Sequence, residues 1–288
     1  MNIVVCAKQV ADSTMVRFDI RTKSLDNLHY ILDPIDEVSV SEAIRIRAKN
    51  GGQVTAITLG PPRAEAALRT CLTLGVDRAI HLCDESFDSV DAHVTAQVLA
   101  QRISSTECDL ILCGNRSMDQ GNGFVGAGIA ALLNMPLVSS VTRIDIFTDT
   151  GTAVVHRRLR GGDREIVETP LPAVMTVDSV LTPPLYPRLR TVLAGLKKEI
   201  ERVDARSLGF DPASCEAASQ VVDISQPKPR LKRTAAIDSS LSATQRMHFL
   251  MSGGMQQKKS NIVQKEPAAA AAEIIQFLFE KGIISRRP

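Results

Sequence analysis

A glycine-rich polar loop between an apolar stretch and a helix holds the residues best suited to chemistry in this sequence. The apolar stretch Leu110–Cys113 runs into the loop Gly114–Gly126, and a helix is predicted from Gly126 to Leu133. Glycine lets a backbone approach a ligand closely, and the first N–H groups of a helix have no intrahelical acceptor. A strand, loop and helix in this order can bind a phosphate group. The loop therefore predicts a protein that holds a nucleotide.

This loop departs from the phosphate-binding motifs that have a strict spacing. Gly121, Gly123 and Gly126 match G-x-G-x-x-G, but they do not follow the first strand, and no Lys-Ser or Lys-Thr pair follows. Taken alone, these residues are also compatible with a flexible surface loop. The five histidines show no spacing to a nucleophile or metal ligand, and no hydrolase motif occurs. Whether the nucleotide is hydrolysed, sensed or merely kept stays open at this point.

The composition is that of a globular protein of 288 residues, with 44% hydrophobic and 23% charged residues. A net charge of +2 and only 3% aromatic residues argue against a nucleic-acid partner. The six cysteines form no Cys-x-x-Cys pair and complete no zinc site, which favours a reducing compartment. Neither a signal peptide nor an apolar run of about 20 residues is recognised. We therefore expect a cytoplasmic protein without metal or membrane insertion.

Strands and helices alternate along the first half of the chain. Apolar runs predict strands at 3–7, 54–59, 78–82 and 109–113, and helix signals predict helices at 34–50, 64–74, 91–105 and 126–133. This alternation predicts an α/β fold with a doubly wound, mostly parallel sheet. Ligands bind such sheets beyond the carboxyl ends of the strands. We therefore expect the loops after residues 7, 59 and 113 to converge.

The pattern changes after residue 137. Turn residues join predicted strands at 141–147, 153–160 and 164–169, which indicates an antiparallel hairpin region, and a further strand is predicted at 171–177. From about residue 180 the pattern of a compact domain ends, apart from a helix at 268–281 with one apolar face. Because that face needs a partner, we expect a long C-terminal arm that wraps another protein, with disorder as the alternative.

An ordered set of motifs over roughly residues 1–205 resembles the beta subunit of electron-transfer flavoproteins. These motifs are Val5-Cys-Ala-Lys-Gln-Val, Asp33-Pro-Ile-Asp36, Leu59-Gly-Pro, the helix Glu65–Gly75, Asp109–Asp119, Leu171-Pro-Ala-Val and the stretch Pro184–Glu201. The set is more specific than the glycine-rich loop alone, because its members occur in the family's order over most of the chain.

The resemblance implies a subunit that pairs with an electron-transfer flavoprotein alpha subunit, which carries or shares FAD. The dimer would accept electrons from dehydrogenases, typically acyl-CoA dehydrogenases, and pass them to an acceptor such as a quinone oxidoreductase. This chain would be an electron-carrier subunit without its own side-chain catalytic machinery. Its own site would hold AMP, or a second FAD in an electron-bifurcating form. A stand-alone nucleotide-binding regulator or an ATP-dependent ligase is the alternative from another class.

Contact residues are also implied by the resemblance. The cofactor-binding set would be Cys6, Ala7, Lys8, Asp33, Pro34, Ile35, Asp36, Leu59, Gly114, Asn115, Arg116, Ser117, Met118, Asp119, Gln120, Gly121, Asn122, Gly123, Phe124, Val125 and Gly126. Tyr186, Leu189 and Arg190 would contact the dehydrogenase, with Leu189 entering an apolar pocket. The implied divisions are a nucleotide-binding domain at 1–182, a dehydrogenase-recognition segment at 183–204 and an arm at 205–288, whose terminal helix would pack on the alpha subunit.

Two positions depart from the family's usual residues. Asp33-Pro-Ile stands where Asn-Pro-Phe is common. Since a carboxylate repels a phosphate, we expect Asp33 to meet ribose hydroxyls or adenine instead. Phe124 stands where glutamine is common, so an apolar ring replaces an amide donor. The sequence therefore leaves the choice between AMP and a second FAD open.

Overall fold

The computed structural model describes residues 1–15, 17–19, 24–26, 28–88, 90–211, 217–219, 222, 241–251 and 265–284. The chain divides into two compact units, Met1–Val222 and Asp223–Pro288. The first unit contains the sheet and both of its helical layers, so it is the unit that positions a site.

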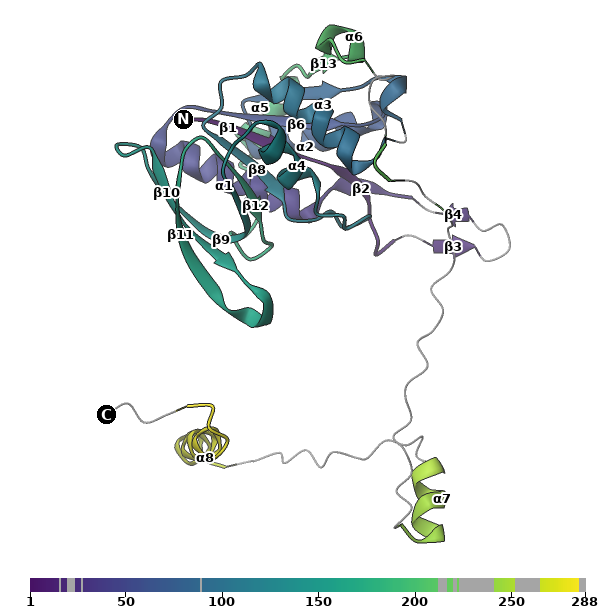
Figure 1. Ribbon diagram of the computed structural model, residues 1–288, viewed down its shortest axis with the longest axis vertical. Coiled ribbons are helices and arrows are strands. Elements are labelled where there is room, and N and C mark those ends of the chain that lie inside the picture. The colour runs from purple at the N-terminus through teal and green to yellow at the C-terminus, as the bar shows by residue number, and fades with distance from the viewer. Residues whose placement is uncertain are drawn as a thin grey trace. The chain divides into compact units, whose positions relative to one another are not determined.

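Nine described strands form one sheet in the order β11-β10-β9-β12-β8-β1-β6-β7-β13 (Figure 1). Its parallel part consists of β1 (Asn2–Cys6), β6 (Gln53–Leu59), β7 (Arg78–Leu82), β8 (Leu110–Gly114), β12 (Ala173–Val177) and β13 (Glu201–Val203). On the other side of β12, β9 (Leu137–Phe147) is parallel to it, and β10 (Thr152–Arg158) and β11 (Arg164–Pro170) follow as antiparallel neighbours. The predicted antiparallel hairpin region is confirmed.

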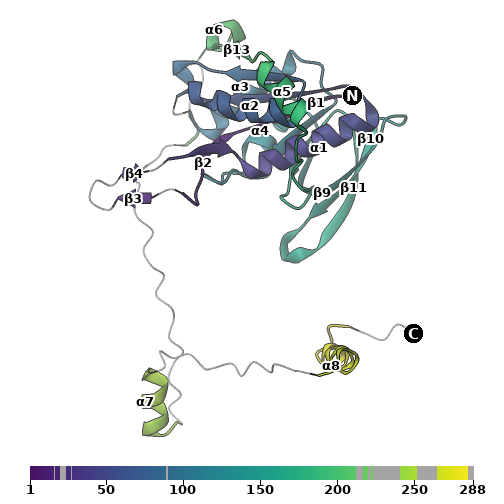
Figure 2. The ribbon, with the colours of Figure 1, turned by 180° about the vertical axis from the view of Figure 1, so that it is seen from behind.

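Helices cover both faces of the sheet, as Figures 1 and 2 show from opposite sides. These helices are α1 (Pro34–Asn50), α2 (Glu65–Leu74), α3 (Ala92–Ser104) and α4 (Val125–Leu132). Successive side chains of a strand point to opposite faces. Accordingly, Val5 belongs to the core formed with α1 and α2, whereas Cys6 belongs to the core formed with α3 and α4. The predicted doubly wound α/β fold is confirmed.

The strand order reverses beside β1. From β1 the chain passes through α1, β6 and α2 to β7, and α3 then returns it over the opposite face to β8, on the other side of β1. The helices on either side of this reversal leave the sheet in opposite directions. A crevice therefore opens beyond the carboxyl ends of β1 and its two neighbours, which is where open α/β sheets bind ligands.

Several elements were not predicted from the sequence. The polar stretch after β1 contains two small antiparallel pairs, β2 (Gln9–Ala11) with β5 (Tyr30–Leu32) and β3 (Arg17–Asp19) with β4 (Ser24–Asp26). Beyond residue 180, α5 (Leu189–Lys197) lies beside α2 (Figure 2), and β13 adds to the sheet by pairing with β7.

The residues directly after β13 also belong to the first unit and pack on its core. It contains α6 (Ala205–Leu208), and the rings of Phe87 and Phe210 meet edge to face at 5.9 Å. Two short 3-10 helices, η1 (Pro62–Ala64) and η2 (Glu85–Phe87), follow β6 and β7, and a third, η3 (Arg160–Gly162), joins β10 to β11. Residues 183–211 thus belong to the first compact unit, although the sequence pattern of a compact domain ends near residue 180.

The second unit contains α7 (Ala243–Met251) and α8 (Pro267–Glu280), of which α8 matches the helix predicted at 268–281. Its exposed apolar side chains include Ile274 and Phe277. Most of the predicted arm between 212 and 264, with Cys215, lies outside the described residues. Among the described helices, none has the length and apolar character needed to cross a membrane.

Gly126 generates a prediction about the packing of α4. A Cβ at this position would lie 2.6 Å from Cγ2 of Thr176 on β12, closer than carbon atoms approach. We expect Gly126→Ala to lower the free energy of unfolding by about 1–3 kcal/mol, because it overpacks a buried contact. Urea denaturation of the purified protein measures this change.

A second substitution tests the cause. Thr176→Ser removes Cγ2 and keeps the hydroxyl that accepts from the Ser140 N–H at 3.2 Å. The double variant Gly126→Ala/Thr176→Ser should therefore be destabilised by less than the sum of the two single variants. Additive losses would show that the clash with Thr176 is not the cause.

Candidate functional site

A cavity of about 360 Å³ lies at the carboxyl ends of the central strands. Its walls come from the ends of β1, β6 and β8, from η1, from η2 and α3, and from the loop that joins β8 to α4. The volume falls in the range of small-molecule sites, and its place matches the reversal in strand order. The expected convergence of the loops after residues 7, 59 and 113 is confirmed.

Most residues of the predicted cofactor-binding set line this cavity. They are Cys6, Ala7, Lys8, Asp36, Leu59, Gly114, Arg116, Ser117, Asp119, Gln120, Asn122, Gly123, Phe124 and Val125. Seven predicted positions do not line it, namely Asp33, Pro34, Ile35, Asn115, Met118, Gly121 and Gly126. They belong to the start of α1, to the loop and, in the case of the buried Gly126, to the first turn of α4, so they can shape the site without facing a ligand.

Asp33 has a different setting from the expected contact with ribose or adenine. It is the N-cap of α1, only 1% exposed, and one carboxylate oxygen accepts from the Ile35 N–H at 2.9 Å. The other oxygen accepts from the Met118 N–H of the loop at 2.7 Å. Since both oxygens are used inside the protein, Asp33 holds the loop against the start of α1.

Asp36, one turn later, ties the loop to β1. One of its carboxylate oxygens accepts from the Lys8 N–H at 2.8 Å, and the other accepts from the Gly114 N–H at 3.0 Å. A Cβ on residue 114 would lie 2.6 Å from the Asp36 oxygen, so this approach requires glycine. Burial raises the pKa of Asp36 to about 8, and the Asp33 carboxylate adds to the rise, although the two N–H donors oppose it.

An ion pair between Lys8 and Asp119 connects the end of β1 to the loop. The Lys8 Nζ lies 2.8 Å from Asp119, and their side chains are 39% and 33% exposed. Burial opposes the ionisation of Asp119, but hydrogen bonds from Lys8, Ser117 and the Gln120 N–H lower its pKa overall. Exposed ion pairs are worth only about 0–1 kcal/mol. An anionic ligand could therefore draw the Lys8 ammonium away from Asp119 at small cost.

The opposite wall was missed by the sequence analysis. It is formed by residues after β6 and β7, including Gly60, Pro61, Arg63, Phe87, Val90, Ala92, Thr95 and Leu99. The sequence did hold a signal for this wall. Ligands bind such sheets beyond the carboxyl ends of the strands, and β7 also ends at this edge of the sheet. This wall is mostly apolar, whereas the end of β1 and the loop supply most of the charged and amide groups.

Two aromatic contacts fix side chains around the cavity. The Arg63 guanidinium lies over the Tyr30 ring at 4.6 Å, and the Arg63 carbonyl accepts from the Gln9 amide at 2.8 Å. The Phe124 ring meets the His93 ring of α3 at 6.1 Å and is 42% exposed. A cavity with one apolar wall and one wall of cations, amides and backbone N–H groups suits a ligand that joins a flat apolar ring to an anionic group.

The predicted partner-contacting residues lie away from this cavity. Tyr186, Leu189 and Arg190 do not line it, and they are exposed at the start of α5. Tyr186 is 97% exposed and Leu189 is 73% exposed, and Leu193 and Leu196 add further exposed apolar surface along the same helix. The domain therefore presents a concave site and a separate apolar surface on a helix.

Comparisons with known proteins agree on one family. The family described as "Electron transfer flavoprotein domain" matches residues 25–208. The electron transfer flavoprotein subunit beta of Thermoanaerobacterium thermosaccharolyticum is 34% identical over 268 residues, which cover 92% of this chain and 97% of the relative. Protein FixA of Azotobacter vinelandii is 34% identical over 250 residues, covering 83% and 89% of the two chains. A caffeyl-CoA reductase-Etf complex subunit, CarD of Acetobacterium woodii, is 34% identical over 219 residues, covering 75% and 82%.

Asp36 generates a prediction about pH. Its carboxyl ionises near pH 3.8 when unperturbed, as in the unfolded chain, but only near pH 8 in the folded protein. Between these values the folded state binds more protons than the unfolded state, so the free energy of unfolding falls as the pH rises. Asp36→Asn cannot ionise, and we expect a flatter dependence from pH 5 to pH 8 in urea titrations. It should also cost about 1–3 kcal/mol at low pH, because one N–H donor loses its acceptor.

Asp119→Asn is the matched control from the same site. The pKa of Asp119 is lowered, so both the folded and the unfolded carboxyl are ionised from pH 5 to pH 8. Its loss should leave the slope over that range unchanged. An equal slope in the wild type and Asp36→Asn would contradict the assignment to Asp36.

Proposed function

The chain belongs to the beta-subunit family of electron transfer flavoproteins, and from this premise we propose that it carries electrons from a dehydrogenase to a downstream acceptor. Membership implies an electron-transfer role and an alpha-subunit partner. The similarity along nearly the whole length of a named beta subunit carries the proposal. In this proposal, FAD is carried by the alpha subunit or shared with it. The electron donors are acyl-CoA dehydrogenases, the electron acceptor is a quinone oxidoreductase, and the protein works in the cytoplasm.

The cavity beyond β1 is the proposed nucleotide site, with AMP as its ligand. The donors available for phosphate and ribose are the Lys8 ammonium, the Ser117 hydroxyl, and the Gln120 and Asn122 amides. The wall from β6, η2 and α3 offers apolar surface to the base. AMP would brace the fold without reacting, so the chain's contribution is to bind and orient. The other residues that the resemblance implies for cofactor binding are part of the proposed site. Among them, Asp33, Pro34 and Ile35 would support the loop from behind.

An electron-bifurcating form of the same family is the alternative. In that form the cavity would hold a second FAD, which would supply a second redox centre. The similarity to a relative named as a subunit of a caffeyl-CoA reductase-Etf complex favours this alternative. The stand-alone regulator considered from the sequence does not account for membership of a subunit family.

Two further surfaces are proposed as contacts with other proteins. Tyr186, Leu189 and Arg190, in the segment 183–204, would contact the dehydrogenase, since they are exposed around the start of α5. The arm at 205–288 would bind the alpha subunit through α8, because burial against a partner would remove the exposed apolar side chains of α8 from water. The domain at 1–182 would carry the nucleotide.

Co-expression tests the proposed partnership. We expect the chain purified alone to be poorly soluble, because α8 would expose Ile274 and Phe277 to water. Co-expression with an electron-transfer flavoprotein alpha subunit should give a yellow heterodimer by size-exclusion chromatography and visible absorbance. A colourless, well-folded monomer that does not bind the alpha subunit would contradict this proposal.

A bulky residue in the cavity tests the nucleotide site. Ala92 lines the cavity at the first turn of α3, so Ala92→Trp places an indole in the space proposed for the base. We expect the nucleotide retained in the cavity to fall by roughly tenfold or more, which is about 1.4 kcal/mol of binding free energy. Mass spectrometry of the denatured heterodimer measures the AMP and FAD retained.

Ser104→Trp is the control on the same helix. Ser104 is exposed at the last turn of α3 and does not line the cavity. This variant should retain the wild-type nucleotide content. Equal nucleotide contents in Ala92→Trp and Ser104→Trp would place the nucleotide elsewhere.

A further inference from the structure

Polar contacts hold both ends of the segment that carries α5. At its start, Arg45 donates to the Pro183 carbonyl at 3.2 Å, and the Leu185 N–H donates to the Ser41 hydroxyl at 3.0 Å. At its end, the Lys198 ammonium donates to the Val76 carbonyl at 2.7 Å. The exposed residues between these ends therefore sit on a frame supplied by α1 and by the end of α2.

Arg69 of α2 caps the carboxyl end of α5. Its guanidinium donates to the carbonyl of Lys198 at 2.6 Å and reaches those of Gly195 at 3.3 Å and Leu196 at 3.4 Å. The last carbonyls of a helix have no intrahelical donor, and a cation at this end also offsets the helix dipole. Arg69 therefore satisfies the groups that would otherwise let α5 fray.

Apolar packing secures α5 only weakly. Gly195 is the only buried residue within Leu189–Lys197, and its backbone lies so close to α2 that an added Cβ would be 2.3 Å from the Leu72 carbonyl oxygen. Leu189, Leu193 and Leu196 are all more than half exposed. A helix of this length is not stable alone in water, so the polar contacts at its ends add to the backbone packing at Gly195 in fixing its position.

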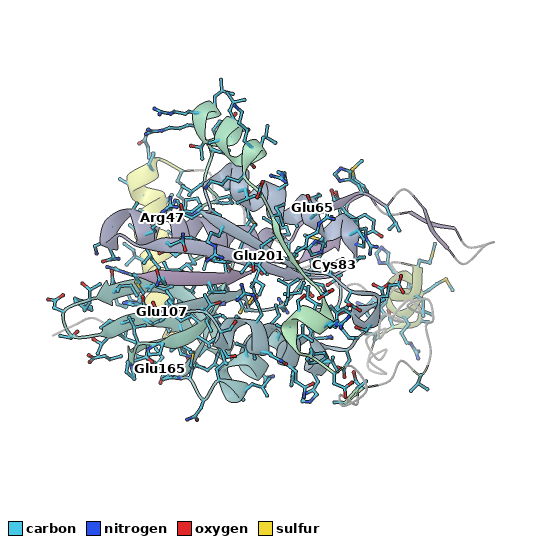
Figure 3. The ribbon with its side chains drawn as sticks, turned by 90° about the horizontal axis from the view of Figure 1, so that it is seen from above. Arg47, Glu65, Cys83, Glu107, Glu165 and Glu201 are labelled. Atoms are coloured by element: carbon cyan, nitrogen blue, oxygen red, sulfur yellow. The ribbon has the colours of Figure 1, made fainter. Side chains whose placement is uncertain are left out.

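Glu65 keeps Arg69 and the following strand in place. Its carboxylate lies 3.6 Å from the Arg69 guanidinium and also accepts from Arg202 of β13 (Figure 3 labels Glu65). The hydrogen bond from Arg202 lowers the pKa of Glu65, and the charges of Arg202 and Arg69 add to this effect. The chain is thus fastened to α2 both at the end of α5 and in β13.

We infer that Arg69 is a positioning residue that sets the placement of α5 for contact with the electron-donating protein. Arg69 itself does not face that protein, because its side chain turns to the carbonyls at the inner end of the helix. This inference rests on the proposed function, in which Leu189 and its neighbours form the contact. Loss of the cap should leave the cavity unchanged and loosen the helix that carries Leu189.

The test uses the heterodimer and an acyl-CoA dehydrogenase reduced by its substrate. Arg69→Gln removes the charge, Arg69→Lys keeps it, and Arg143→Gln is a control that breaks an exposed pair with Asp145 on β9. Hydrogen exchange reports the amides of α5, and steady-state kinetics with the heterodimer as varied substrate reports kcat and KM. Leu189→Ala serves as an independent probe of the contact.

We expect Arg69→Gln to speed exchange in α5 by at least about tenfold. We expect it to raise KM by about fivefold to tenfold, with kcat changed less than about twofold, because only docking is affected. Arg69→Lys should recover part of both effects, and Arg143→Gln should match the wild type. Leu189→Ala should raise KM without changing exchange.

The outcomes separate this inference from the proposed function. If Leu189→Ala raises KM but Arg69→Gln does not, Arg69 does not position the contact. An unchanged exchange rate in Arg69→Gln also overturns the inference. If neither variant changes KM, or the wild type accepts no electrons from the dehydrogenase, the proposed contact through α5 fails instead, and the inference fails with it.

Discussion

Two buried aspartates at the start of α1 fix the geometry on which the site depends. Asp33 accepts from the N–H groups of Ile35 and Met118, and Asp36 accepts from those of Lys8 and Gly114. These four bonds join the start of α1, the end of β1 and the loop after β8. Because unpaired buried N–H groups cost about 1–3 kcal/mol each, the loop cannot shift without breaking contacts in two other elements. The carboxyl oxygens of both aspartates are thus occupied by backbone N–H donors inside the protein.

The cavity follows from this frame and from the order of the strands. The reversal beside β1 opens the crevice, the fastened loop forms one wall, and the residues after β6 and β7 form the other. Most polar groups that can reach a ligand come from the loop and the end of β1, while the facing wall is mostly apolar. The first unit presents the cavity and the exposed apolar residues of α5 as separate surfaces, since Leu189 and its neighbours lie outside the cavity. α2 connects the two, because it follows η1 at the cavity and carries Arg69 under α5.

The alternation of strands and helices could be predicted because buried parallel strands such as Ile3–Cys6 are continuous apolar runs. Their carboxyl ends must meet at one edge, so the convergence of three loops was also predictable. β13 could not be recognised, because Glu-Arg-Val has no periodic signal and its pairing with β7 spans more than a hundred residues. The setting of Asp33 was missed for a related reason. Its acceptor role toward Met118 arises only after the loop folds back onto α1. The resemblance supplied most of the cavity residues, and geometry then separated those that line it from those that support it.

Counting the nucleotides in the wild-type heterodimer tests the central claim most directly. The protein would be denatured after co-purification with its alpha subunit, and the released FAD and AMP would be quantified by absorbance and mass spectrometry. If the cavity held by Asp33 and Asp36 binds a nucleotide, we expect about two adenine nucleotides per heterodimer. One FAD with one AMP would identify the simple carrier, and two FAD the bifurcating form. A single FAD with no second nucleotide would contradict the assignment of the cavity.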